Sequence, residues 1–421
     1  MGIKIFTPEL LGKMKQCVTE AEKLSENNPV YSKHVVMARR VFDETDESLR
    51  NMKSKTNIGD RDYGVGQTYL ENPVGGGKGY NNIISPTDPR IKFTVSSNSS
   101  TSPDGLIYAL NHVSEGDIIY IADKAMIDLS GTTNLAIPDG ITLASGRGRN
   151  DSPGGLIYTA SITTTWDVFI RLGNKVTLNG IRVCGPDGNP AGTSNMSGIR
   201  TTNHNGIVIE NCEIFNFPFE GIGAYIDSLE GLSSPKAAWI HHNYIHNNQR
   251  NGFGYGVDVG LASALIEGNI FDLNRHHVAG NRSRPGVATT NYEVRYNLFM
   301  NVNNNSLVDC HGGNDSKAWG NPNDPDVNTA AGGTLLIHHN TFTISEKPSV
   351  AIRGVPAVIC KVFNNWTYVP DVSKVPEDLA FKQRLENVNG NVIDGKTITG
   401  KEYIRMQVYN NKYGYDNPVI Y

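Results

Sequence analysis

The stretch Ile337-His338-His339-Asn340-Thr341-Phe342 is one copy of a phrase that recurs between residues 239 and 368. The phrase consists of an apolar residue, two variable residues, an asparagine and further apolar residues. The other copies are Ile240-His241-His242-Asn243-Tyr244-Ile245, Ile266-Glu267-Gly268-Asn269-Ile270-Phe271, Val294-Arg295-Tyr296-Asn297-Leu298-Phe299 and Val362-Phe363-Asn364-Asn365-Trp366. The asparagines of the five copies are 26, 28, 43 and 25 residues apart. A repeat of this length, lengthened once by an insertion, indicates a solenoid in which each repeat forms one coil.

Each copy carries the signal of a β-strand, because β-branched and aromatic residues alternate with polar ones. An asparagine at one fixed place in each coil suits a corner, where its side chain can bond backbone and where it tolerates a left-handed conformation. Stacked at the strand spacing of ~4.8 Å, such asparagines can also form an amide ladder. The alternative is that they only mark loops between unrelated strands.

Composition limits the class of protein. The chain has 421 residues, 44 of them glycine, and only 19% of the residues are charged, which suits short strands joined by tight corners. A formal net charge of −4 provides no basic field for nucleic acid, so no nucleic-acid partner is expected. The five cysteines are widely spaced without a CxxC pair, and we expect buried thiols rather than a disulfide framework or a zinc site.

The sequence contains no run of 18 apolar residues, and we therefore expect no membrane span. The first 25 residues lack the apolar core of a secretion signal. We interpret the chain as a secreted or periplasmic protein whose signal peptide is absent from this sequence. An intracellular protein is the alternative.

The predicted organisation begins with helices. Residues 1–55 form an N-terminal segment of amphipathic helices, because Thr7-Pro8 and Asn28-Pro29 each place a capping side chain before a proline. These helices would cover the open end of a solenoid, or they would be the tail of an upstream domain. Residues 56–100 are rich in glycine and asparagine and read as a loop draped over the solenoid. No GxxxxGK[ST] motif accompanies these glycines, which argues against nucleotide binding.

Residues 101–370 are expected to form the solenoid itself, and residues 371–421 a C-terminal extension that packs on it. Within that extension we predict a short helix at 376–387 and a strand at 404–409. Within the solenoid the chain reads EGDIIYIAD (115–123), LAIPDGITLASGRG (135–148), VTLNGIRVCGP (176–186) and IVIENCEIFNF (207–217).

These segments resemble the opening coils of right-handed parallel β-helix proteins of the pectate lyase-like superfamily, and the resemblance covers roughly residues 100–370. It implies an all-β solenoid, a right-handed parallel β-helix with an N-terminal α-helical cap. It also implies a carbohydrate-active protein, but that superfamily includes lyases, hydrolases, esterases, epimerases and non-catalytic tail spikes. No single catalytic family is matched.

A second strand follows each repeat asparagine by about ten residues and supplies a candidate site. If Val257, Val259 and Val308 point into the core, strict alternation places their neighbours on the outer face. The predicted outward column is Tyr225, Asp258, His277, Asp309 with His311, and Arg353. A register error of one residue would reverse these orientations.

Positive charge gathers beside this column. The stretch 275–284 contains Arg282 and Arg284 and no acidic residue, which suits an anionic, extended polymer. The insertion at 312–333 brings Asp315 and Trp319, and Trp319 could face a sugar ring. The pairs His241-His242 and His338-His339 look like metal ligands, but adjacent strand residues face opposite ways, and a structural role is expected.

Two reactions fit the column. In β-elimination from a uronate polymer, Arg282, Arg284 or Arg353 would bind the carboxylate, His277 or His311 would act as the base, and Tyr225 or Tyr255 as the acid. Asp309 could orient one of the histidines.

In hydrolysis, Asp258 and Asp309 would act as an acid and base pair two coils apart, ~9.6 Å from strand spacing. We favour a lyase acting on an anionic polysaccharide; the alternatives are this inverting glycoside hydrolase and a non-catalytic carbohydrate-binding β-helix. The sequence establishes no cofactor; Ca²⁺ is the one considered, with Asp309 and Asp315 as its candidate ligands.

Overall fold

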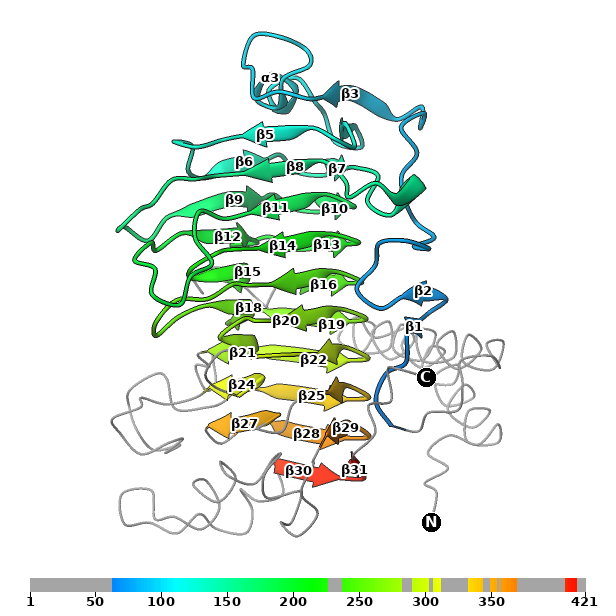
Figure 1. Cartoon of the computed structure of the whole chain (residues 1–421), viewed down its shortest axis with the longest axis vertical. Coiled ribbons are helices and arrows are strands. Elements are labelled where there is room, and N and C mark those ends of the chain that lie inside the picture. Colours follow the sequence, from blue (N-terminus) through cyan, green and yellow to red (C-terminus); the bar gives the residue numbers. More distant parts are fainter. Residues whose placement is uncertain are drawn as a thin grey trace, which may run out of the picture. The chain divides into compact units, whose positions relative to one another are not determined.

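The computed structural model describes residues 63–225, 237–281, 290–302, 306–311, 332–343, 349–353, 356, 358–368 and 406–414. In this part the chain winds through three stacked parallel sheets (Figure 1). The helical segment predicted at 1–55 and the helix predicted at 376–387 lie outside the described residues.

Sheet I has 11 strands: β3 (Ile91–Val95), β4 (Ile118–Ile121), β7 (Thr142–Ala144), β10 (Thr177–Asn179), β13 (Ile207–Glu210), β16 (Ala237–His241), β19 (Ser263–Glu267), β22 (Asn291–Arg295), β25 (Thr334–His338), β28 (Ile359–Phe363) and β30 (Met406–Tyr409). Sheet II has 10 strands: β5 (Met126–Asp128), β8 (Leu156–Tyr158), β11 (Arg182–Cys184), β14 (Glu213–Phe215), β17 (Tyr244–His246), β20 (Ile270–Asp272), β23 (Leu298–Phe299), β26 (Thr341–Phe342), β29 (Trp366–Tyr368) and β31 (Lys412–Gly414). Sheet III has 8 strands: β6 (Leu135–Ile137), β9 (Val168–Leu172), β12 (Ser197–Arg200), β15 (Glu220–Tyr225), β18 (Tyr255–Gly260), β21 (His276–Asn281), β24 (Val308–His311) and β27 (Val350–Arg353).

From β4 to β29, successive strands enter sheets I, II and III in turn, and each strand pairs in parallel with its counterpart in the next coil, as β13 does with β16, β14 with β17 and β15 with β18. The described part of the chain is therefore an all-β fold, a parallel β-helix. The predicted right-handed winding stays a prediction. The first coil begins at Ile91, inside the region expected to be loop. Strands β30 and β31 add a coil inside the expected C-terminal extension.

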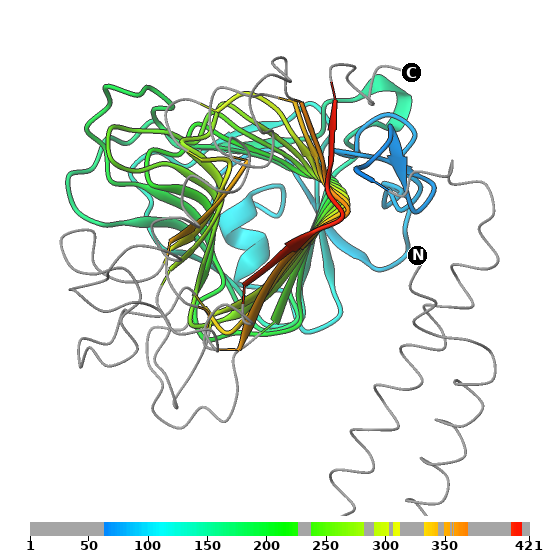
Figure 2. The same ribbon diagram turned by 90° about the horizontal axis from the view of Figure 1, so that it is seen from below.

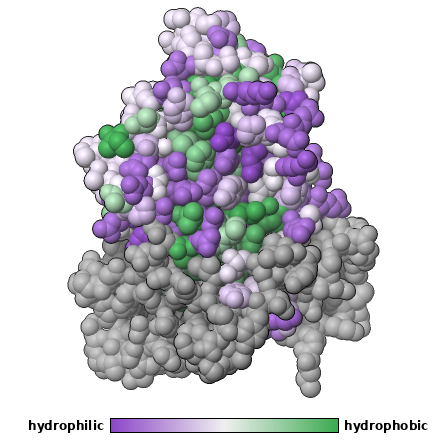
Figure 3. Space-filling view, viewed as in Figure 1, coloured by the Kyte–Doolittle hydropathy of each residue, from purple (hydrophilic) through white to green (hydrophobic). Residues whose placement is uncertain are grey.

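The interior of the coils is apolar. Phe271, Phe299 and Phe342 occupy the same place in three consecutive coils and stack with ring centroids 5.1 and 4.9 Å apart. On the face in Figure 3, hydrophilic residues are interspersed with small apolar groups. This is the pattern that alternating strand residues produce when one side of each sheet faces the core. The described cysteines, Cys184, Cys212, Cys310 and Cys360, are free thiols, and all but Cys184 are buried.

A short helix, α3 (Leu106–Leu110), covers one end of the core, and Figure 2 shows it across the lumen of the coils. Its buried residues Leu106, Ala109 and Leu110 belong to the same apolar cluster as Val95 of β3. In the part of the chain that the structure describes, no helix is long and apolar enough to cross a membrane.

The predicted asparagine ladder is present at the corner between sheets I and II. The side-chain oxygen of Asn269 accepts the backbone N–H of Asn243 at 2.9 Å and its amide at 3.0 Å. Asn297, Asn340, Asn365 and Asn411 continue the same pairing from coil to coil. Because each amide also donates to a backbone carbonyl, the ladder satisfies polar groups that the corner would otherwise leave unpaired.

The sequence analysis allowed the ladder asparagine itself to adopt the left-handed conformation at each corner. In the structure the residue before the asparagine adopts it. His242, Tyr296 and His339 have φ values of 53°, 51° and 54°. The ladder asparagine is buried with its side chain directed along the stack, and the turn is made one residue earlier. The histidines His242 and His339 therefore belong to the corner, which supports the structural role predicted for the paired histidines.

Residues 63–84, here called the strap, run along this corner across several coils. The backbone N–H of Gly64 donates to the carbonyl oxygen of Asn364 at 3.0 Å, and that of Gly77 donates to the side-chain oxygen of Asn211 at 2.7 Å. The strap includes the antiparallel pair β1 (Thr68–Tyr69) and β2 (Asn72–Pro73).

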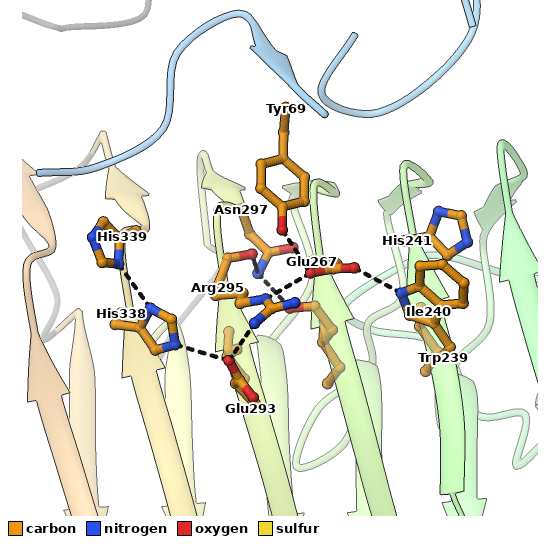
Figure 4. A network of polar contacts seen from close by, with 12 residues as sticks. Tyr69, Trp239, Ile240, His241, Glu267, Glu293, Arg295, Asn297, His338 and His339 are labelled. Carbon is orange, nitrogen blue, oxygen red and sulfur yellow. Dashed lines mark hydrogen bonds and ion pairs between the residues drawn. The ribbon is translucent and has the colours of Figure 1, made fainter. Parts of the chain in front are cut away.

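The strap also completes a polar network on sheet I (Figure 4). The buried carboxylate of Glu267 accepts hydrogen bonds from the Tyr69 hydroxyl at 2.9 Å, the Trp239 indole at 2.8 Å and Nε of Arg295 at 2.6 Å. Arg295 also donates to Glu293, at 2.8 Å. These contacts tie the strap to three strands of the sheet and balance the buried carboxylate with a guanidinium.

Candidate functional site

The outer face of sheet III presents two rows of residues along the coils. The first row lies where the strands begin and contains Glu220, Tyr255 and His276, which are aligned in register. The second row lies three residues later in each strand and contains Gly223, Asp258, Ala279, Asp309 and Ala351. Polar side chains from four coils thus meet on one surface.

Between the two rows, two successive residues of a strand face the interior. His277 packs among the core phenylalanines and Val278 belongs to the apolar core, whereas the flanking His276 and Ala279, although also buried, lie on the other face of the strand. Strict alternation is therefore broken at this point of sheet III.

The outward orientation predicted for His277 is consequently wrong. Its ring packs between Phe271 and Phe299 in the core, with centroids 5.8 and 5.6 Å away. Its Nδ1 accepts from the Asn274 amide at 3.1 Å. Burial lowers the pKa of His277 to about 3. The outward histidine is its neighbour His276.

A cluster around Tyr225 joins the two rows. The Tyr225 hydroxyl is hydrogen-bonded to Asp258 and lies 2.9 Å from Oε2 of Glu220. Nε of Arg200 donates to Oε1 of Glu220 at 2.6 Å, and the guanidinium lies over the Tyr225 ring at 4.8 Å. Burial raises the pKa of the Glu220 carboxyl, which Arg200 opposes. Burial and the Asp258 charge raise the pKa of Tyr225, so its proton stays on the phenol.

A second cluster surrounds His276. Its Nδ1 lies 2.7 Å from the carbonyl oxygen of Ser306, and its Nε2 lies 3.6 Å from Oδ2 of Asp309. The ring stacks on Tyr255, with centroids 5.8 Å apart and planes 5° from parallel. A carbonyl oxygen only accepts hydrogen bonds, so Nδ1 carries a proton and Nε2 faces the carboxylate.

Asp258 and Asp309 lie two coils apart, as the sequence analysis expected. Asp258 pairs with Ala279, and Ala279 pairs with Asp309, so the two acids occupy the same position two coils apart. Both acids are almost fully buried. Because Ala279 has a small side chain, no bulky group separates the two carboxylates within the row.

The remaining predicted residues are placed only in part. His311 of β24 and Arg353 of β27 are paired in register, next to the row that contains Asp309. The structure does not describe their side chains, and Arg282, Arg284, Asp315 and Trp319 lie outside the described residues. Their contributions to the site stay predictions.

Sequence reasoning missed Arg200 and Glu220. A signal was available: Glu220-Gly221-Ile222, Tyr255-Gly256-Val257 and His276-His277-Val278 align, each with a polar or aromatic residue followed by two inward ones. Reading this shared break in alternation would have placed Glu220 and His276 outward.

Metal binding has no support from the described side chains, among which no group of three or more His, Cys, Asp or Glu residues could hold an ion. The Ca²⁺ alternative involves Asp315, outside those residues, and it stays a prediction.

No protein-family model matches the sequence, and no curated protein matches it. Among solved structures, the alginate lyase from Paenibacillus sp. str. FPU-7 is similar with a TM-score of 0.39 and 16% identity, over 77% of this chain and 98% of that one. ORF18 of Geobacillus virus E2 is similar with a TM-score of 0.34 and 12% identity, over 60% of this chain and 45% of that one. Both TM-scores are below 0.5, so neither similarity supports an argument about the function of this chain.

Proposed function

We propose that the protein is a polysaccharide lyase that cleaves an acidic, uronate-containing polysaccharide by β-elimination on the outer face of sheet III. The observation that carries the proposal is the geometry of the almost fully buried His276, whose Nδ1 is bound by a backbone carbonyl while its Nε2 lies beside Asp309. Because such polymers occur outside cells, we also propose that the protein is secreted or periplasmic.

His276 is the proposed base. With a proton on Nδ1, the neutral imidazole has its lone pair on Nε2 and can accept the C5 proton of a uronate. The Asp309 carboxylate, 3.6 Å away, stabilises the imidazolium that forms. His276 thereby replaces His277 in the predicted role.

Elimination also needs an acid and a cation. The electron pair of the broken C5–H bond forms the C4–C5 double bond, the C4–O4 bond breaks, and O4 takes a proton. Tyr255, which stacks on His276, or Tyr225 would supply that proton. Arg275, whose guanidinium lies 5.9 Å from the Tyr255 ring centre, is near enough to join Arg282, Arg284 and Arg353 as a partner for the uronate carboxylate.

The second candidate is an inverting glycoside hydrolase. The shared position of Asp258 and Asp309 two coils apart favours it, because a backbone separation of ~9.6 Å is compatible with the ~6.5–9.5 Å between the carboxyl groups of such enzymes. In this reaction one aspartate would protonate the leaving oxygen and the other would activate water.

The test is to incubate the protein with acidic polysaccharides, with and without Ca²⁺, while ultraviolet absorbance and reducing ends are followed together. Elimination creates an unsaturated product, so both signals rise. Reducing ends without absorbance would contradict the lyase and favour hydrolysis by Asp258 and Asp309. Binding without either signal would favour a non-catalytic carbohydrate-binding β-helix.

A further inference from the structure

A row of aromatic rings leads from the surface of the protein to His276. Trp166, in the loop before β9, is 58% exposed, although its ring contacts Phe219 at 4.7 Å and Phe253 at 5.2 Å between centroids. Phe219 in turn contacts Tyr255 at 6.0 Å, and Tyr255 stacks on His276 at 5.8 Å. The rings lie where the chain enters β9, β15, β18 and β21 of sheet III, so the row follows the axis of the β-helix and passes over the coil of β12.

This row has the chemistry of a sugar-binding track. The apolar face of a pyranose packs well on an exposed aromatic ring, and carbohydrate sites combine such rings with a few polar groups. Trp166 is held in place by two phenylalanines, so little conformational freedom is lost when a ligand covers its exposed face. An exposed indole that its neighbours already hold in place is better suited to binding a ligand than to stabilising the fold.

Positive charge lies beside the row. The Arg250 guanidinium is 5.8 Å from the Trp166 ring centre and 4.7 Å from that of Phe253. Its Nη1 donates to the carbonyl oxygens of Ser194 and Thr193, at 3.2 and 3.3 Å, and to the side-chain oxygen of Asn195. Among the described residues, no carboxylate forms an ion pair with Arg250. Neutral acceptors fix the guanidinium, and its charge is left for an anionic ligand.

We propose that Trp166 and Arg250 form a distal subsite that binds a uronate residue of the polymer several sugars away from the bond that is cleaved. The sugar ring would stack on Trp166, and its carboxylate would face Arg250. The inference rests on the proposed function for the identity of the polymer, but it concerns binding and not the chemical step. Three successive ring contacts, from Trp166 through Phe219 and Tyr255 to His276, separate the subsite from the proposed base, so the subsite discriminates longer oligomers from shorter ones.

The experiment uses the full chain carrying His276→Gln, so that a bound oligomer is not cleaved. Hexasaccharides of alginate and of polygalacturonate, and the same oligomers with their carboxyl groups reduced to alcohols, are titrated while tryptophan fluorescence is followed. Trp166→Phe, Trp166→Ala and Arg250→Gln are compared with Ile162→Ala. Ile162 serves as the surface control, because it lies in the same loop as Trp166 and is similarly exposed, at 56%.

We expect at least one uronate hexasaccharide to bind. Trp166→Ala should raise the Kd about ten-fold, Trp166→Phe should abolish most of the fluorescence change, and Ile162→Ala should alter neither. Arg250→Gln should weaken binding of the uronate oligomer about ten-fold and leave that of its reduced counterpart unchanged.

Equal affinities in all variants would overturn the subsite while leaving cleavage by the parent protein unaffected. No response to either uronate oligomer, or a preference for the reduced ones, would overturn the assignment to an anionic sugar. If binding depends on Trp166 but the wild-type protein, with His276 intact, cleaves no polymer, the subsite is supported and the proposed reaction is contradicted. The two hypotheses therefore fail separately.

Discussion

Nε2 of His276 lies 3.6 Å from Oδ2 of Asp309, while Nδ1 of the same ring is fixed by the carbonyl oxygen of Ser306 at 2.7 Å. The carbonyl decides which nitrogen carries the proton, and the carboxylate stabilises the imidazolium after proton transfer. One nitrogen of the ring is thus fixed by the backbone and the other lies beside a buried carboxylate, which is the arrangement that the proposed base requires. This pair is therefore the centre of the proposed reaction.

His276→Gln should lower kcat/KM by about 10²–10⁴-fold, the range over which a positioned acid–base group contributes, while the fold is retained. The measurement is the rate of unsaturated product formation, with circular dichroism as the test of folding. His112→Gln is the control, because His112 is an exposed histidine beside α3. Full activity of a folded His276→Gln variant would contradict the assignment of the base.

Asp258→Asn distinguishes the two reactions. In the lyase, Asp258 acts on the reaction through the Tyr225 hydroxyl that it binds, so the variant should lose less than about ten-fold in kcat/KM. In a hydrolase, both Asp258→Asn and Asp309→Asn should lose about 10³-fold or more, since each acid would take a direct part. Equal, severe losses accompanied by saturated products would exclude the lyase.

The fold was predictable because its information is local and repeated. Asn243, Asn269, Asn297 and Asn340 recur once per coil, and one buried amide per corner is enough to specify how coils stack. The start of the β-helix was missed. Ile91–Val95 has the strand pattern, but no ladder asparagine follows it and it lies in the glycine-rich region that was predicted to be a loop.

The site was predictable only in part, because orientation on a strand depends on tertiary packing. Asp258 and Asp309 were placed correctly, since each lies between two core residues in a regular stretch. His277 was placed on the wrong face, because the strand turns two successive residues inward at its start. A prediction based on strict alternation is then in error by one residue, which reverses the face that it assigns. The Trp166 row depends on loops whose conformation no repeat specifies.

Removal of one ladder amide should destabilise the whole domain. In Asn297→Ala, the backbone N–H and the amide of Asn269 lose their acceptor, and the carbonyl of Ile266 loses a donor. Each buried group left unpaired costs roughly 1–3 kcal/mol, so the midpoint of chemical denaturation should fall clearly. Asn301→Ala is the matched control, because Asn301 bonds Asp272 at the exposed surface. Equal midpoints would show that the ladder contributes little.

A methyl group at position 76 should displace the strap. Gly76 has a φ of +67°, and an added Cβ would lie 2.3 Å from the carbonyl oxygen of His242. Gly79 has a φ of +90° but nothing within 4 Å of such a Cβ, so Gly79→Ala carries the backbone strain without the collision. We expect limited proteolysis to cleave the strap faster in Gly76→Ala than in Gly79→Ala. Identical cleavage rates would contradict close docking of the strap.

Acid should destabilise the protein through His277. Burial lowers its pKa to about 3, against an ordinary value near 6.5, and protonation of Nδ1 would oppose the Asn274 amide that donates to it. Between these values the unfolded chain binds the proton and the folded chain does not, so stability falls as the pH decreases from about 6.5 to about 3, at up to about 1.4 kcal/mol per pH unit. The free energy of unfolding, measured by urea denaturation across this window, should fall less steeply in His277→Gln than in the wild type. His241 and His339, whose pKa values burial also lowers, should keep a residual slope in the variant. Parallel curves for wild type and variant would mean that His277 is not a neutral core residue.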